Sequence, residues 1–204
     1  MHGPDAAFWQ DRFERGDTPW DRGGPSPQLL AWIDSGRLAP CRIIVAGCGS
    51  GWEVAELARR GFGVTGIDLA PAACDRTRSL LAAHGLHARI EQADALDWRP
   101  SAPVDAVFEQ TCLCAMHPSH WRRYESSLAE WTRPGGSLFA MIAQRPRPSA
   151  IEEGLIEGPP YHSDINAMRM LFDDARWSWP SPLYPRSTHP NGMHEFGLVI
   201  GRRA

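Results

Sequence analysis

The stretch Val45-Ala46-Gly47-Cys48-Gly49-Ser50-Gly51 decides the fold, because it joins a strand pattern to a helix pattern through three glycines. Residues 42–46 form a β-branched run, and the apolar residues of 52–60 recur at helical spacing. Glycines at such a junction let the backbone turn sharply, and the first N–H groups of the helix then point toward a bound ligand. The turn therefore predicts a ligand site with these candidate residues: Gly47, Cys48, Gly49 and Gly51.

Short strands and helices alternate along the rest of the chain, which is typical of a parallel sheet covered by helices on both faces. Further strands are expected at residues 63–67, 87–91, 104–108 and 137–143, and helices at 71–84, 119–131 and 163–171. Residues 177–184 and 195–200 are expected to close the fold as an antiparallel edge hairpin. The first of these strands should be irregular, because Pro180 and Pro182 cannot donate ladder hydrogen bonds. Without an internal repeat or a long linker, residues 1–204 are expected to form a single domain.

Acidic residues follow the second and third expected strands. Asp68 comes 17 residues after Gly51 (68 minus 51), with Leu69 beside it, and Asp94 with Ala95 follows the third strand. Because the carboxyl ends of parallel strands meet at one edge, these residues should converge on the glycine turn. There Asp68 could accept hydrogen bonds from ribose hydroxyls, and Asp94 with the Ala95 N–H could meet an adenine edge. If the glycines only turned the chain and Asp68 only capped a helix, this ordered trio would be unexplained.

An adenosyl group can belong to a dinucleotide or to S-adenosylmethionine. A dinucleotide site prefers the spacing G-x-G-x-x-G, whereas here the glycines are Gly47-x-Gly49-x-Gly51. Glu53 near the helix start would also repel a pyrophosphate. S-adenosylmethionine carries no phosphate, so the sequence favours it as the cofactor.

The composition excludes several other chemistries. The 204 residues include no lysine, which excludes a lysine Schiff base and the lysine of an ATP-binding P-loop. The net charge of −3 gives no basic excess for nucleic acid. Without a long apolar stretch or a leader pattern, no membrane partner is expected and the chain is predicted to be cytoplasmic. Five cysteines without C-x-x-C spacing predict free thiols and no metal site. The expected partner is a small molecule, and the expected state is a monomer or small homo-oligomer.

Several motifs in consistent order extend from about Phe8 to Tyr161. They are Phe8-Trp9-x-x-Arg12-Phe13, Thr18-Pro19-Trp20-Asp21-x-Gly23, Ala46-Gly47-Cys48-Gly49-x-Gly51, Val64-x-Gly66-Ile67-Asp68-Leu69, Asp94-Ala95-Leu96, Glu109-x-Thr111-x-x-Cys114-Ala115 and Gly158-Pro159-Pro160-Tyr161. In these motifs the chain resembles the thiopurine S-methyltransferase superfamily, and within it the halide and thiol methyltransferases and their bacterial relatives. The amino-terminal tryptophan motif and G-P-P-Y are far more specific than the glycine turn.

The resemblance implies the seven-stranded, mostly parallel, doubly wound α/β sheet of S-adenosylmethionine-dependent methyltransferases, with residues 1–40 covering the cofactor. It implies that Trp9, Phe13 and Trp20 surround the sulfonium, a cation that aromatic faces attract by about 0.5 to 2 kcal/mol. The resemblance also implies that Glu109 faces the cofactor or its neighbourhood, and the alternative is a helix-capping or solvated carboxylate. Family members often have tryptophan at the position of Phe13. Gln110 replaces an arginine or tyrosine of relatives, which leaves the acceptor open.

The loop 145–165 is rich in proline and glycine and is expected to be a lid over the substrate. Tyr161 and His162 in this loop are the candidate catalytic residues, Tyr161 to orient the acceptor and His162 as a base where one is needed. Packing of the Pro159-Pro160 turn is the alternative role of Tyr161. A thiol or other soft nucleophile needs mainly desolvation and alignment, so S-methylation is the expected reaction. The alternatives are O- or N-methylation of a small metabolite and non-catalytic binding of S-adenosylmethionine.

Overall fold

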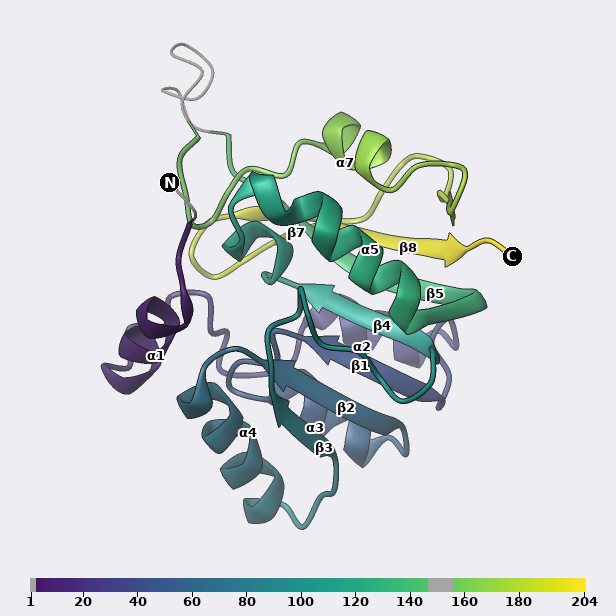
Figure 1. The fold of residues 1–204 in the computed structure, drawn as a ribbon. Coiled ribbons are helices and arrows are strands. Elements are labelled where there is room, and N and C mark those ends of the chain that lie inside the picture. The colour runs from purple at the N-terminus through teal and green to yellow at the C-terminus, as the bar shows by residue number, and fades with distance from the viewer. Residues whose placement is uncertain (1–2, 147–155) are drawn as a thin grey trace.

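The computed structural model describes residues 3–146 and 156–204, which form one mixed sheet with helices on both faces (Figure 1). The strands of this part of the chain are β1 (Arg42–Ala46), β2 (Gly63–Asp68), β3 (Arg89–Gln92), β4 (Val104–Gln110), β5 (Thr132–Gln144), β6 (Trp177–Ser178), β7 (Arg186–Thr188) and β8 (His194–Arg202). The α-helices are α1 (Ala6–Glu14), α2 (Pro27–Asp34), α3 (Trp52–Arg59), α4 (Pro71–Ala83), α5 (Trp121–Trp131) and α7 (Ile165–Leu171). Two short 3-10 helices, Leu113–Ala115 and Pro118–His120, precede α5.

The strand order is β3-β2-β1-β4-β5-β8-β6, and the short β7 pairs with β8 outside this path. Strands β1 to β5 pair in parallel, and β8 runs antiparallel to β5, β6 and β7. The expected α/β class, the mostly parallel sheet and the antiparallel strands at its end are therefore confirmed. Seven strands lie on the path as expected, and β7 is an additional one.

Helices cover both faces because the central strands are apolar on both sides. In β1, Ile43 and Val45 belong to the core under α2 and α3, together with Leu29 and Leu57. Ile44 belongs to the opposite core, which includes side chains of α5 and α7. Alternate residues of a strand point to opposite faces, so one five-residue strand serves both cores. This arrangement makes the sheet doubly wound.

The expected strand at 177–184 is wrong beyond its first two residues. Only Trp177 and Ser178 form β6, because Pro180 and Pro182 interrupt the ladder, as proline must. The chain resumes strand pairing as β7, which pairs with the first residues of β8, whereas β6 pairs with the last ones. Strand β8 consequently lies between β5 and β6 instead of at the sheet edge.

Strand order reverses at β1, which pairs in parallel with β2 on one side and with β4 on the other. Strands β2 and β3 extend the sheet in one direction, and β4 and β5 extend it in the opposite direction. In open α/β sheets, ligands bind in the crevice at the carboxyl ends of the strands at such a reversal. The glycine turn after β1 lies at this point. No helix in the described ranges 3–146 and 156–204 is long and apolar enough to cross a membrane.

Gly51 lets helix α3 pack directly against helix α4. Its φ is +84°, a left-handed conformation that favours glycine. A Cβ at this position would lie 2.7 Å from side-chain atoms of Thr77 and 2.9 Å from its Cα. The third glycine of the turn therefore supports the fold, and it does not line the cavity described below.

Gly51→Ala is expected to destabilise the protein by at least about 2 kcal/mol, which urea unfolding can measure. The left-handed residue costs about 1 to 2 kcal/mol and the overlap with Thr77 about 1 to 3 kcal/mol. Gly85→Ala is the matched control, because Gly85 also has a positive φ, +63°, but has open space around its Cα. Gly85→Ala should lose only the stability that the left-handed conformation costs. Equal losses in the two variants would contradict the close packing of α3 on α4.

Candidate active site

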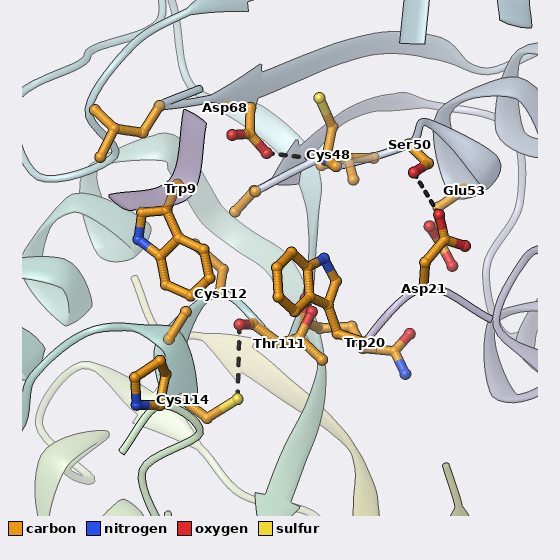
Figure 2. A pocket seen from close by; sticks show the side chains of 18 of the residues that line it. Trp9, Trp20, Asp21, Cys48, Ser50, Glu53, Asp68, Thr111, Cys112 and Cys114 are labelled. Carbon is orange, nitrogen blue, oxygen red and sulfur yellow. Dashed lines mark hydrogen bonds between the residues drawn. The ribbon is translucent and has the colours of Figure 1, made fainter. Parts of the chain in front are cut away.

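A cavity of about 240 Å³ lies at the carboxyl ends of the central strands, beneath the amino-terminal segment (Figure 2). One side, here called the strand-end wall, follows β1, β2 and β3 and is formed by Gly47, Cys48, Gly49, Ser50, Asp68, Leu69, Ala93, Asp94 and Ala95. The opposite side, the distal wall, contains Arg22, Gln110, Thr111, Cys112, Cys114, Ala115, Met116, Pro159, Pro160, Asn191 and Met193. The amino-terminal segment adds Trp9, Arg12, Phe13, Trp20 and Asp21.

The strand-end wall presents two carboxylates that backbone N–H groups hold in place. Asp68 accepts hydrogen bonds from the N–H of Gly49 (2.9 Å) and of Ala70 (3.0 Å). Asp94 accepts one from the N–H of Leu96 (2.8 Å). Burial raises the pKa of Asp68 above its ordinary value, and the backbone hydrogen bonds oppose that shift. Neither carboxylate is within ion-pair distance of an arginine in the described residues, so both can serve a ligand.

The aromatic side chains of the amino-terminal segment form a cluster over the cavity. The ring of Trp20 packs edge to face on Trp9 (centroids 5.4 Å apart) and on Phe13 (5.7 Å). Figure 2 shows Trp9 and Trp20 next to each other, between Asp68 and Cys114. The expected cover residues therefore do lie together at the cavity. Helix α1, which carries Trp9 and Phe13, packs against Ala70 and Ala73 at the start of α4.

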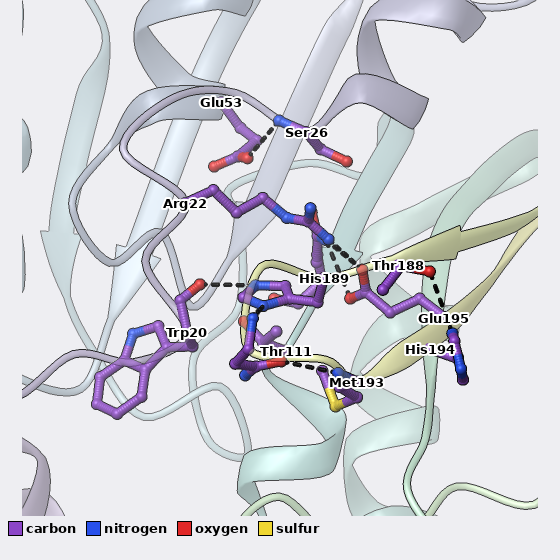
Figure 3. A network of polar contacts seen from close by, with 12 residues as sticks. Trp20, Arg22, Ser26, Glu53, Thr111, Thr188, His189, Met193, His194 and Glu195 are labelled. Carbon is purple, nitrogen blue, oxygen red and sulfur yellow. Dashed lines mark hydrogen bonds and ion pairs between the residues drawn. The ribbon is translucent and has the colours of Figure 1, made fainter.

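Residues 20–26 are fastened to the body of the protein by polar contacts at both ends. The Asp21 carboxylate accepts hydrogen bonds from Ser50 Oγ and from Trp52 Nε1 (2.8 Å). Burial raises the pKa of Asp21. These two hydrogen bonds and a third from the N–H of Gly23 lower it, and the net result is a pKa below the ordinary value. The Trp20 carbonyl accepts a hydrogen bond from His189 Nε2 (2.9 Å) (Figure 3).

Glu53 holds the other end of this segment. Its carboxylate accepts a hydrogen bond from the N–H of Ser26 (2.9 Å), and burial raises its pKa to about 7. Glu53 also lines the cavity, so the residue expected to repel a phosphate does face the ligand space. The segment between Trp20 and Ser26 is thus a fixed part of the cavity lining.

The distal wall contains one arginine, which forms an ion pair with a buried carboxylate behind the wall. Arg22 pairs with Glu195, whose side chain is 0% exposed. Gln110 Nε2 donates to both oxygens of the same carboxylate, at 3.0 Å each. Thr111 has a φ of +61°, a strained backbone conformation of the kind that clusters at functional sites. Burial raises the pKa values of Cys112 and Cys114, so both remain thiols.

Two expected catalytic residues, Tyr161 and His162, do not line the cavity. Tyr161 is buried beneath Gly158, packs edge to face on His117 (5.5 Å) and donates its backbone N–H to the Cys114 carbonyl (2.7 Å). His162 Nδ1 accepts a hydrogen bond from the N–H of Arg145 (3.1 Å). Both side chains therefore support the loop, whereas its prolines, Pro159 and Pro160, reach the cavity. Part of the expected lid, residues 147–155, lies outside the described residues.

Glu109 is also absent from the cavity lining. The carboxylate turns back to accept a hydrogen bond from the N–H of Leu113 (2.6 Å). Burial raises its pKa to about 7. Its side chain thus closes the turn after β4, and the neighbouring Gln110 and Thr111 face the ligand space instead.

Sequence reasoning missed roles for Asp21, Arg22, Asn191 and Met193. Asp21 stood in a recognised motif without an assigned contact, and Asn191 stood in an expected turn. Nothing in the local pattern of residues 189–195 connects them to residues 20–22, more than 160 positions away. Only the closure of the sheet by β8 brings them together.

The cavity fits S-adenosylmethionine. Gly47 and Gly49 line the cavity with backbone in positive-φ conformations that favour glycine. A Cβ at Gly47 would lie 3.0 Å from the Cys112 Cβ, so a side chain at this position would crowd the cavity wall. The carboxylates of Asp68 and Asp94 suit hydroxyl and amino donors, and the aromatic cluster suits a cation. Carboxylates facing the cavity disfavour a phosphate. No group of three or more metal-binding side chains is present in the described ranges.

Solved structures of low sequence identity share this fold. One was reported under the description "Conversion of a Disulfide Bond into a Thioacetal Group during Echinomycin Biosynthesis". Its TM-score is 0.78, its identity is 24%, and the match covers 97% of this chain and 92% of that chain. Another is the 1,6-didemethyltoxoflavin-N1-methyltransferase of Burkholderia thailandensis with bound S-adenosylhomocysteine. Its TM-score is 0.75, its identity is 18%, and the match covers 98% of this chain and 87% of that chain.

Sequence relatives carry related names. Thiopurine S-methyltransferase of Legionella pneumophila strain Corby is 26% identical over 212 residues, which cover 95% of this chain and 91% of that protein. Probable thiol methyltransferase 2 of Arabidopsis thaliana is 27% identical over 160 residues, 78% of this chain and 68% of that protein. Thiocyanate methyltransferase 1 of Brassica oleracea is 28% identical, over 75% of this chain and 66% of that protein.

The family profile described as thiopurine S-methyltransferase matches residues 4–179, well over half of the chain. The resemblance read from the motifs is therefore confirmed. The chain belongs to the thiopurine S-methyltransferase family of S-adenosylmethionine-dependent methyltransferases.

Proposed function

We propose that this enzyme methylates the sulfur of a small organic thiol or another soft nucleophile. The observation that carries the proposal is the make-up of the distal wall. In the described part of the chain, no histidine, tyrosine, aspartate or glutamate lines that wall. The carboxylates that do line the cavity, those of Asp21, Glu53, Asp68 and Asp94, lie outside this wall, and each accepts a hydrogen bond from the protein. A wall without a base suits an acceptor that needs none, and a thiolate is such an acceptor.

The strand-end wall and the amino-terminal aromatics are proposed to hold the cofactor. Asp68 would bind the ribose hydroxyls, Asp94 and the Ala95 N–H the adenine, and Gly47, Cys48, Gly49 and Leu69 would line its path. Trp9, Phe13 and Trp20 would surround the sulfonium. When bound, S-adenosylmethionine supplies an electrophilic methyl group.

The acceptor sulfur forms its new bond to the methyl carbon with its own lone pair. With S-adenosylmethionine bound, the old carbon–sulfur bond would break toward the sulfur of the cofactor, so the products would be a thioether and S-adenosylhomocysteine, and the thiol proton would be lost to water. The chain contributes alignment of the reactants and exclusion of water. Good alignment can lower the activation free energy by about 7 to 11 kcal/mol. Cys112 and Cys114 do not compete as acceptors, because burial keeps both protonated.

We further propose that residues 1–204 act as one cytoplasmic domain, with residues 1–40 as the cover and 145–165 as the substrate lid. One continuous sheet supports the single domain. All five cysteines are free, as is usual in a reducing compartment. Pro159 and Pro160 at the cavity support the lid.

Asp68→Ala should weaken binding of S-adenosylhomocysteine at least about tenfold. It removes one or two hydrogen bonds to a charged acceptor, each worth about 1.5 to 3 kcal/mol. Isothermal titration calorimetry measures the affinity. Asp105→Ala is the control, because Asp105 lies near the opposite end of β4 and pairs with Arg133 at the surface. Unchanged affinity in a folded Asp68→Ala protein would remove this residue from the cofactor site.

Thiols should be methylated faster than phenols or amines of similar size, and the rate should rise as pH passes the thiol's own pKa. This pH dependence follows because the thiolate is the nucleophile and the enzyme adds no base. Formation of S-adenosylhomocysteine measures the rate, and His162→Ala should leave the profile unchanged.

Two outcomes would contradict the proposal in different ways. A rate that follows a histidine-like pKa and disappears in His162→Ala would favour O- or N-methylation. Absence of S-adenosylhomocysteine with every acceptor, despite cofactor binding, would favour a non-catalytic binding protein.

A further inference from the structure

The distal wall contains one arginine, Arg22, whose charge a buried carboxylate cancels. Arg22 lines the cavity, and its guanidinium pairs with Glu195 of strand β8. The Glu195 side chain is completely buried and does not itself line the cavity. Figure 3 shows Arg22 reaching from the amino-terminal segment to this carboxylate.

Gln110 fixes the Glu195 carboxylate in this position. Its Nε2 donates to both Oε1 and Oε2 of Glu195, each at 3.0 Å. The carboxylate is therefore held from two sides, by a cation and by a neutral amide. Because Glu195 is shielded from water, its charge acts on Arg22 in a low-dielectric surrounding, where screening is weak.

The remainder of the distal wall carries no charge that could replace the cancelled one. Its other described side chains are neutral, and Cys112 and Cys114 are protonated. An arginine in an acceptor site would ordinarily attract an anion. Here the pair as a whole is neutral, so an anionic group on the acceptor would be desolvated without gaining a partner.

From this arrangement we propose that Glu195 is a specificity-determining residue, which acts through Arg22 to select acceptors whose body is uncharged. The inference rests on the proposed S-methylation and names its substrate class: small thiols with a neutral, largely apolar body. Glu195 does not touch the reacting atoms. It sets the net charge of the wall that the acceptor contacts.

The test compares two thiols of nearly equal size, methyl 3-mercaptopropanoate and 3-mercaptopropanoate, which differ in the charge of the body. The wild-type enzyme should favour the ester in kcat/KM at least about tenfold. Glu195→Gln keeps the size of the side chain and one acceptor oxygen, but it replaces the other oxygen with a donor and removes the negative charge that is paired with Arg22. It should lower the ratio of ester to acid at least about tenfold.

A matched control and a rescue separate charge from fold stability. Glu125 is also buried and paired with an arginine, Arg176, but neither lines the cavity. Glu125→Gln should therefore leave the selectivity ratio unchanged. The double variant with Arg22→Gln and Glu195→Gln removes both charges and should restore the preference for the ester.

Binding of the reaction products gives a readout that does not depend on turnover. The thioethers methyl 3-(methylthio)propanoate and 3-(methylthio)propanoate can be titrated by calorimetry into each variant saturated with S-adenosylhomocysteine. Their affinity ratio should follow the same order as kcat/KM. A wild-type preference for the acid, or equal ratios in the wild type and Glu195→Gln, would overturn the inference. Failure of every thiol to react would instead refute S-methylation, while the affinity ratios would still test the role of Glu195.

Discussion

Two carboxylates, the half-buried Glu53 of α3 and the buried Glu195 of β8, fasten residues 20–26 to the body of the protein, and the shape of the cavity depends on this attachment. Glu53 receives the N–H of Ser26, and Glu195 receives the guanidinium of Arg22. Burial raises the pKa values of both carboxyl groups, which means that their desolvation is unfavourable and only partly offset by their partners. The sheet alone would present an open crevice at the ends of β1, β2 and β4. The fastened segment covers one side of that crevice, and such a cover reduces the contact of a bound nucleophile with water.

The amino-terminal cover consists of two parts with different anchoring. Residues 20–26 contact α3, β8 and the β7–β8 loop through polar groups, and Ser26 is 1% exposed. Helix α1 is held more weakly: Phe13 is its one buried side chain, and it contacts α4 through Gln10 and through the Phe13 carbonyl. A nine-residue helix is marginal in isolation. Gly16, with a φ of +69° and open space around it, joins the two parts. The geometry thus gives the cofactor a fixed wall on one side and a lightly docked helix on the other.

Local patterns predicted the strand-end wall well. The glycine turn follows β1, Asp68 ends β2 and Asp94 comes two residues after β3, so strand periodicity and parallel topology were sufficient to bring them together. The aromatic cluster of Trp9, Phe13 and Trp20 was predicted from the motif resemblance, because no periodicity places an amino-terminal segment over a sheet edge.

The distal wall could not be predicted from the sequence. Arg22 and Glu195 are 173 positions apart, and the orientation of Tyr161 depends on how the Gly158–Pro160 turn packs against Cys114.

Hydrogen exchange with and without S-adenosylhomocysteine shows whether the cofactor binds between the strand-end wall and the amino-terminal cover. The amides of Asp21, Gly23 and Ser26 donate to Thr18, Asp21 and Glu53 and should be protected in both states. The amides of α1 should exchange quickly in the free protein and slow markedly on binding, because the ligand completes the surface against which the helix packs. Equal exchange of the α1 amides in both states would mean that the cofactor does not bind beneath this helix.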